Sequence, residues 1–234
     1  GDLDRASAES AASGRRQLTL SPLLRRDRER CWCMDEQRTI GFAGVGRMGE
    51  ALVKGLLSRG VFPPSRILVS DVVAERAIAV AETYQVTCVP STEELAERSD
   101  ILVLATKPQD IPGLTESIAR HVKRDAVVIT LAAGVRTSLV EGILKSRGRV
   151  IRMMPNLACG VGEGATAFAL GATATDADAA LVEEIMGSVG RATRVEERHL
   201  DAVTGLSGSG PGFMAALAVA MIEGGIRSGL PKDV

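Results

Sequence analysis

Short apolar runs alternate with stretches of helical periodicity along the chain from residue 39 onward. Apolar, β-branched runs that suit strands lie at residues 39–43, 67–70, 86–89, 101–105, 127–131 and 150–153. Stretches with the spacing of helices lie between them, at residues 49–59, 73–83, 92–98, 111–121 and 138–145. This alternation is typical of a parallel sheet wrapped by crossover helices. We therefore predict an α/β fold with a doubly wound parallel sheet.

Two of these runs, residues 101–104 and 127–129, are apolar at every position. Strands covered by helices on both faces have this pattern, so both runs belong in the middle of the sheet. Right-handed crossovers place the carboxyl ends of the strands along one edge, where ligands of such sheets bind.

The sequence becomes rich in Gly and Ala after Asn156, with a predicted helix at 176–188, a short strand at 192–195 and an apolar helix at 211–227. We predict three parts: an extension without periodicity at 1–38, the sheet domain at 39–197, and the beginning of an all-helical domain at 198–234. The last helix, with Pro211 in its first turn, is either an interface between copies or a core helix of this chain. Its longest apolar run, 211–222, is shorter than the roughly 20 residues that span a bilayer, which argues against a membrane anchor.

Both ends of the chain suggest a cut or processed sequence. The first 30 residues are polar and rich in Arg, and Met34 is the predicted natural start. The alternative is an organelle transit peptide, which the Arg and Ser content favours and the acidic residues oppose. At the other end, Gly229-Leu230-Pro231 indicates a helix end followed by a new helix, so we expect sequence beyond Val234.

Charge and cysteine content narrow the functional classes. A formal net charge of -1 and a pI near 6.2 give no general attraction to a polyanion, so we predict neither a nucleic-acid nor a membrane partner. The cysteines, Cys31, Cys33, Cys88 and Cys159, lack the paired spacing of a zinc site and the density of a disulfide scaffold. We therefore predict a reducing, cytoplasmic setting and no metal site.

A glycine fingerprint follows the first predicted strand. Gly44-Val45-Gly46-Arg47-Met48-Gly49 matches G-x-G-x-x-G and opens a helix, as a dinucleotide-binding turn requires. Gly44 permits the tight turn, Gly46 lets the backbone approach a pyrophosphate, and Gly49 lets the helix pack on the strand. The segment 39–197 is therefore predicted to be a Rossmann-type domain that binds NADH or NADPH.

An acid, Asp71, ends the second predicted strand, where the ribose of the adenosine is usually bound. Its charge would repel a 2′-phosphate and so favours NAD, whereas Ser70 and Arg76 could offset that charge for NADP. Asp71 could equally cap the following helix. The sequence leaves the preference between the two cofactors open.

Several motifs together resemble the pyrroline-5-carboxylate reductase family, from Thr39 to the end of the chain. The most specific are DAVTGLSGSGP and GGIRSGLP. Five further segments carry the resemblance: IGFAGVGRMGEAL, ATKPQ, LAAGV, RVIRMMPN and GEGATA. The family makes proline by reducing a cyclic imino acid with NAD(P)H, and the resemblance implies this activity and a homodimer or higher homo-oligomer formed through the C-terminal helices.

The resemblance also implies which residues form the site. The implied cofactor contacts are Ala43, Gly44, Val45, Gly46, Arg47, Met48, Ser70, Thr92, Ala105, Thr106, Lys107, Pro108, Leu131, Ala132 and Ala133. Glu197 resembles the substrate-side acid of the family, although a solvated carboxylate at a helix start would look the same. Hydride delivery to a protonated imine needs little general acid catalysis, and neither histidine lies in a nucleophile–base arrangement.

The chain departs from the family pattern in two places. Leu157-Ala158-Cys159 stands where the family usually has Thr-Pro, so the turn there is expected to differ. The segment of the Ser-Pro-Gly-Gly-Thr-Thr type that grips the substrate carboxylate is absent because the chain ends first, which implies that the catalytic residues are incomplete and the fragment alone does not turn over. Two alternatives remain open: another Rossmann imine or β-hydroxyacid reductase, and a non-catalytic NAD(P)-binding regulatory protein.

Overall fold

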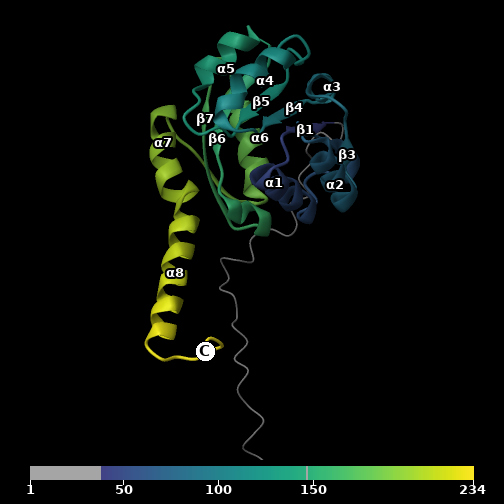
Figure 1. Cartoon of the computed structure of the whole chain (residues 1–234). Helices are drawn as coiled ribbons and strands as arrows, with labels where there is room; N and C mark the ends of the chain where they lie inside the picture. Colours follow the sequence, from purple (N-terminus) through teal and green to yellow (C-terminus); the bar gives the residue numbers. More distant parts are fainter. Residues whose placement is uncertain (1–37, 146) are drawn as a thin grey trace, which may run out of the picture. The chain divides into compact units, whose positions relative to one another are not determined.

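An eight-stranded, mostly parallel sheet forms the centre of the computed structural model (Figure 1). The structure describes residues 38–145 and 147–234, all within one compact unit. The strands are β1 (Ile40–Ala43), β2 (Ile67–Ser70), β3 (Thr87–Cys88), β4 (Ile101–Leu104), β5 (Val127–Thr130), β6 (Arg149–Met154), β7 (Gly164–Leu170) and β8 (Gly190–Arg194). Their order is β3-β2-β1-β4-β5-β6-β7-β8, and only the β6–β7 pair is antiparallel.

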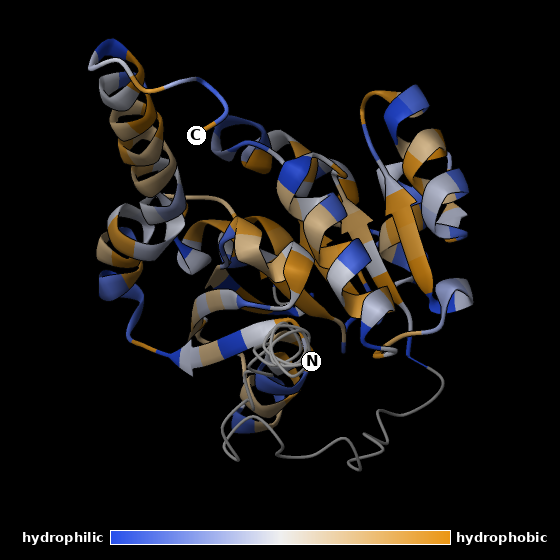
Figure 2. Ribbon diagram, turned by 90° about the horizontal axis from the view of Figure 1, so that it is seen from below, coloured by the Kyte–Doolittle hydropathy of each residue, from blue (hydrophilic) through white to orange (hydrophobic). Residues whose placement is uncertain are grey.

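Helices cover both faces of the sheet and bury two hydrophobic cores. The helices are α1 (Arg47–Ser58), α2 (Ala74–Tyr84), α3 (Thr92–Arg98), α4 (Ile111–Ile118), α5 (Thr137–Leu144), α6 (Asp176–Gly187), α7 (Leu200–Val203) and α8 (Gly210–Arg227). In one core, α1, α2 and α6 pack against strand side chains such as Phe42 and Val103. In the other core, α3, α4 and α5 pack against strand side chains that point the opposite way, such as Leu102. The apolar strands and the facing sides of the helices are orange in Figure 2.

The predicted Rossmann-type sheet is confirmed, and its strand order reverses between β2-β1 and β4, as in a doubly wound fold. The first six predicted strands and the short strand near 192–195 are present within a few residues of their predicted bounds. The strand β7 was not predicted. Its residues are largely Gly and Ala, so the sequence lacks the β-branched enrichment that marks strands, although Phe168 in its middle is fully buried.

The last predicted helix, 211–227, is present as α8 (Gly210–Arg227), with Pro211 in its first turn. The sequence did not predict the helical turns that lead into it: η5 (Glu197–His199), α7 and a π-helical turn, Thr204–Gly208. Proline has no N–H and crowds the preceding turn, and the wider turn, in which Ser209 donates to the carbonyl of Thr204 at 2.9 Å, lies just before Pro211.

The helical segment that contains the apolar run 211–222 is longer than the run itself. Among the described residues, the segment Glu197–Arg227 is long and apolar enough to cross a membrane by length and composition. None of the residues of α8 is buried in this chain, and Phe213, Leu217 and Met221 are more than half exposed. The prediction for residues 1–38, including Met34 as natural start, lies outside the described residues except for Arg38.

Candidate active site

The glycine fingerprint forms a tight turn between β1 and α1. Gly44 has a φ of 99°, which favours glycine, and its N–H donates to the carbonyl of Ser70 at 2.8 Å. A side chain at Gly49 would collide with the carbonyl oxygen of Gly44, whereas a Cβ at Gly46 would have nothing within 4 Å. Gly44 and Gly49 are thus required by the protein itself, and Gly46 leaves open space for a ligand.

The loop after β4 lies directly against this turn. The N–H of Ala105 donates to the carbonyl of Ala43 at 2.8 Å, and a Cβ at Gly44 would come within 2.8 Å of the carbonyl oxygen of Ala105. Thr106 follows Ala105, and its hydroxyl is buried with no hydrogen-bond partner among the described residues. A buried hydroxyl normally has a partner, so a bound polar group at this reversal point of the sheet would satisfy it.

The carboxylate of Asp71 ties the end of β2 to the fingerprint. Its Oδ2 accepts the N–H of Val45 at 2.9 Å, and its Oδ1 accepts the N–H of Val73 at 2.9 Å. The guanidinium of Arg76 contacts both oxygens, at 3.3 and 3.4 Å. Asp71 is not the N-cap residue of α2, because the helix begins at Ala74 and its N-cap is Val73. The Asp71 carboxylate accepts the N–H of Val73 and none of the N–H groups of the first helical turn that the structure describes.

The other predicted cofactor residues lie along the same edge. Thr92 begins α3 just beyond β3, at the end of the edge nearest β2. At the other end, Leu131 follows β5 and donates to the carbonyl of Leu104, while the N–H of Ala132 donates to the hydroxyl of Thr130 at 3.3 Å. The remaining members of the predicted set are Arg47, Met48, Lys107, Pro108 and Ala133, of which Met48 is partly buried and the others are exposed.

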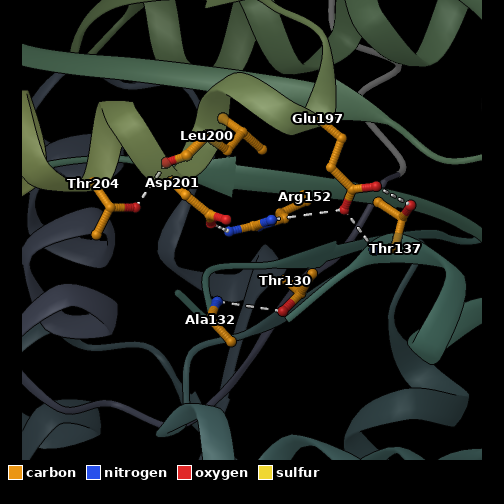
Figure 3. Close-up of polar contacts among 8 residues, drawn as sticks. All are labelled: Thr130, Ala132, Thr137, Arg152, Glu197, Leu200, Asp201 and Thr204. Atoms are coloured by element: carbon orange, nitrogen blue, oxygen red, sulfur yellow. Dashed lines mark hydrogen bonds and ion pairs between the residues drawn. The ribbon is translucent and has the colours of Figure 1, made fainter. Parts of the chain in front are cut away.

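The carboxylate of Glu197 lies beside Thr137, in the first turn of α5 (Figure 3). It accepts the N–H of Thr137 at 2.7 Å and the hydroxyl of Thr137 at 3.0 Å. Negative charge is favourable at a helix N-terminus, so this contact stabilises α5. The structure thus places Glu197 at the start of α5, the helix that follows the loop of Leu131, Ala132 and Ala133, although the sequence separates them widely.

A buried arginine that sequence reasoning missed connects Glu197 to α7. The side chain of Arg152 in β6 is 2% exposed; its Nη2 donates to Oδ1 of Asp201 at 2.6 Å and its Nη1 lies 3.8 Å from Oε1 of Glu197 (Figure 3). Its Nε is buried and has no hydrogen-bond partner in the part of the chain that the structure describes. A charged residue within the apolar run Val150-Ile151-Arg152-Met153-Met154 was the signal for this position, because buried charges are rare unless paired.

The turn after β6 is hydrogen-bonded both to β7 and to the π-helical turn before α8. The side chain of Asn156 accepts the N–H of Ala165 at 3.1 Å and donates to the carbonyl of Ser207 at 3.4 Å. At the position where the sequence departs from the family pattern, Leu157–Val161 forms a 3-10 turn. Leu157 is half exposed there, and Cys159 is fully buried. Burial raises the pKa of the Cys159 thiol, so it remains a neutral packing group.

The described part of the chain contains no group of three or more His, Cys, Asp or Glu side chains that could hold a metal ion. Cys31 and Cys33 lie outside it.

These residues fit a dinucleotide. The fingerprint, the Asp71 carboxylate and the buried Thr106 hydroxyl each follow a parallel strand, so they lie at one edge of the sheet. The N-terminus of α1 lies at Gly46, beside which there is open space. Free amides and a helix N-terminus favour a pyrophosphate there. Each part of the predicted site has a matching chemical group on a dinucleotide.

Comparisons with known proteins agree with this arrangement. Residues 39–134 match the family described as NADP oxidoreductase coenzyme F420-dependent, and residues 197–234 match the family described as pyrroline-5-carboxylate reductase dimerisation. A pyrroline-5-carboxylate reductase of Glycine max is 34% identical over 199 residues, which cover 85% of this chain and 72% of that protein. The enzyme of Methanosarcina acetivorans is 37% identical over 197 residues, covering 84% and 73%.

A solved structure is similar throughout the same region. The pyrroline carboxylate reductase of Plasmodium falciparum, crystallised with NADP bound, superposes with a TM-score of 0.75 at 25% identity and covers 85% of this chain and 72% of that one. Identity at this level over this share of the relatives is sufficient to assign the family. This chain belongs to the pyrroline-5-carboxylate reductase family.

Proposed function

We propose that this chain binds NADH or NADPH along the carboxyl edge of its sheet and reduces 1-pyrroline-5-carboxylate, a cyclic imino acid, to L-proline. The chain is an oxidoreductase by family membership. The relative from Plasmodium falciparum was solved with NADP bound, which supports a nicotinamide cofactor here.

The observation that carries the proposal is the position of Glu197 at the start of α5, the helix that follows the β5 loop. The proposed cofactor residues follow β1, β2, β3, β4 and β5, and the Glu197 carboxylate contacts Thr137, at the start of the helix that follows the β5 loop. A carboxylate is therefore available at the end of the cofactor edge away from Asp71. This is where a protonated imine nitrogen would benefit from a nearby negative charge.

The chemistry requires little acid–base catalysis from the protein. When bound, the reduced nicotinamide supplies a hydride that the imine carbon accepts, and the electron pair of the C=N bond passes to the already protonated nitrogen. The fingerprint and the loops after β4 and β5 orient the cofactor, and Glu197 favours the cationic imine. These roles predict contributions from positioning and electrostatics rather than from a nucleophile.

We also infer that the active form is a homodimer or higher homo-oligomer built through the C-terminal helices. The apolar residues of α8 are exposed in the single chain, and the family model that matches residues 197–234 is a dimerisation domain. An uncovered apolar helix of this length would be costly in water, and a second copy is the partner that this family model supports. A cytoplasmic location is part of the same proposal, supported by the free cysteines Cys88 and Cys159.

The proposal is tested on the complete natural protein that carries these residues. Purified protein is mixed with 1-pyrroline-5-carboxylate and either NADH or NADPH, and both the loss of absorbance of the reduced nicotinamide and the formation of proline are followed. Proline formed in equal amount to the cofactor oxidised supports the proposal. Cofactor binding without proline formation would favour another imine substrate or a regulatory protein.

A further inference from the structure

The residues at the end of β2 determine which nicotinamide cofactor the site favours. This inference rests on the proposed function. The side chain of Asp71 is 5% exposed, and both its oxygens are held, one by Val45 and one by Val73. The negative charge is therefore fixed in place beside the fingerprint. In Rossmann-type domains, the end of this strand lies beside the adenosine ribose.

The neighbours of Asp71 provide few donors for a phosphate. The two residues that follow it, Val72 and Val73, have apolar side chains that are 99% and 41% exposed, and Ser70 before it is buried. Arg76 is the cation in contact with this segment, and its guanidinium contacts both oxygens of Asp71. The local charge is thus roughly balanced instead of positive, and a phosphate group would have to compete with Asp71 for Arg76.

The carboxylate still has capacity for a neutral ligand group. A carboxylate offers about four acceptor sites, and two backbone N–H groups use one on each oxygen, while the contacts of Arg76 are long. A ribose 2′-hydroxyl can donate to a remaining site. A 2′-phosphate carries negative charge and cannot donate when ionised.

We propose that Asp71 makes this protein select NADH over NADPH, by accepting the ribose 2′-hydroxyl and repelling the 2′-phosphate. The Coulomb repulsion of neighbouring charges near a protein surface corresponds to about tenfold or more in affinity. Glu75, in the first turn of α2, provides a matched control because it is another acid close by in sequence.

The test measures binding of NADH and NADPH separately, without substrate, by calorimetric titration of the complete protein, its Asp71→Ser variant and its Glu75→Gln variant. We expect the natural protein to bind NADH about tenfold or more tightly. Asp71→Ser should bring the two affinities close together by strengthening NADPH, and Glu75→Gln should keep the original ratio. Equal or tighter binding of NADPH by the natural protein would overturn the proposal.

Two other outcomes separate this proposal from the reductase activity. If Asp71→Ser weakens both cofactors by the same factor, Asp71 only anchors the loop through Val45 and the proposal is wrong. If the NADH preference and its loss in Asp71→Ser are found but the protein forms no proline, the selection is supported and the reductase proposal fails. Failure to bind either cofactor would overturn both.

Discussion

The carboxylate of Glu197 holds Thr137 at two points, its N–H at 2.7 Å and its hydroxyl at 3.0 Å, although 60 residues separate the two in sequence. Thr137 begins α5, directly after the loop proposed to face the nicotinamide. The contact therefore fixes the proposed substrate-side acid relative to the proposed cofactor edge. Glu197 therefore has a structural role, the contact with Thr137, and a proposed role in catalysis, and substitutions can separate these two roles.

Glu197→Gln is expected to lower kcat/KM by about tenfold or more, because a neutral amide no longer favours the cationic imine. Its carbonyl can still accept the N–H of Thr137, so stability should change by less than about 1 kcal/mol. Thr137→Val, which removes one hydroxyl and keeps the charge of Glu197, is the matched control. If both variants lose activity equally, Glu197 acts only by holding α5.

Asp201→Ala is expected to destabilise the protein more than Arg152→Met, although the two residues form one ion pair. The Asp201 side chain is 71% exposed, so it can be solvated when Arg152 is removed, whereas the guanidinium of Arg152 is 2% exposed. Leaving that guanidinium with one partner fewer costs about 1–3 kcal/mol. Urea unfolding of both variants measures the difference, and the opposite order would show that the burial asymmetry does not govern this pair.

Two glycines of the fingerprint should respond differently to alanine. Gly46→Ala should leave the free energy of unfolding nearly unchanged but weaken cofactor binding by about tenfold or more, because the new methyl group enters the space where the pyrophosphate approaches. Gly49→Ala should destabilise the fold by about 1–3 kcal/mol, because its methyl group meets the Gly44 carbonyl. Thermal unfolding and cofactor titration of each variant distinguish the two effects. Equal loss of stability in both would contradict the assignment.

Much of the fold could be predicted from the sequence, because buried parallel strands are apolar at every position and the fingerprint fixes the first strand–turn–helix. The strand β7 could not, since Gly and Ala carry little strand signal. The residues of the candidate site could be predicted from the sequence only in the loops that follow the strands. The ion pairs of Arg152 with Glu197 and Asp201 join β6 to the start of the last helix, so they depend on tertiary packing. Their only sign in the sequence is a charged residue, Arg152, within an apolar run.

The exposed face of α8 predicts self-association. Leu217→Glu places a charge on an apolar surface and should shift the protein toward monomer in sedimentation experiments, whereas Arg227→Gln, at the polar end of the same helix, should not. Helical content measured by circular dichroism shows whether the variant still folds. An unchanged assembly in a folded Leu217→Glu protein would mean that α8 is not the interface.

Asp178 gives the protein a stability term that depends on pH. Burial alone would raise the pKa of this carboxyl, but hydrogen bonds from Arg149 and Thr175 outweigh burial and lower it. A lowered pKa stabilises the folded state above the unfolded value of about 3.9, and this stabilisation is lost as the pH falls through the folded value. Asp178→Asn should therefore be less stable than the natural protein at pH 7, by about 1–3 kcal/mol, and the gap should shrink in acid below about pH 4. A gap that is constant with pH would contradict this role.

The central claim is that the complete protein is a pyrroline-5-carboxylate reductase, and the most direct measurement is proline formation from 1-pyrroline-5-carboxylate with NADH and NADPH supplied separately. The account predicts one proline for each cofactor oxidised, with the greater kcat/KM for NADH. Nicotinamide binding without any proline formed would contradict it.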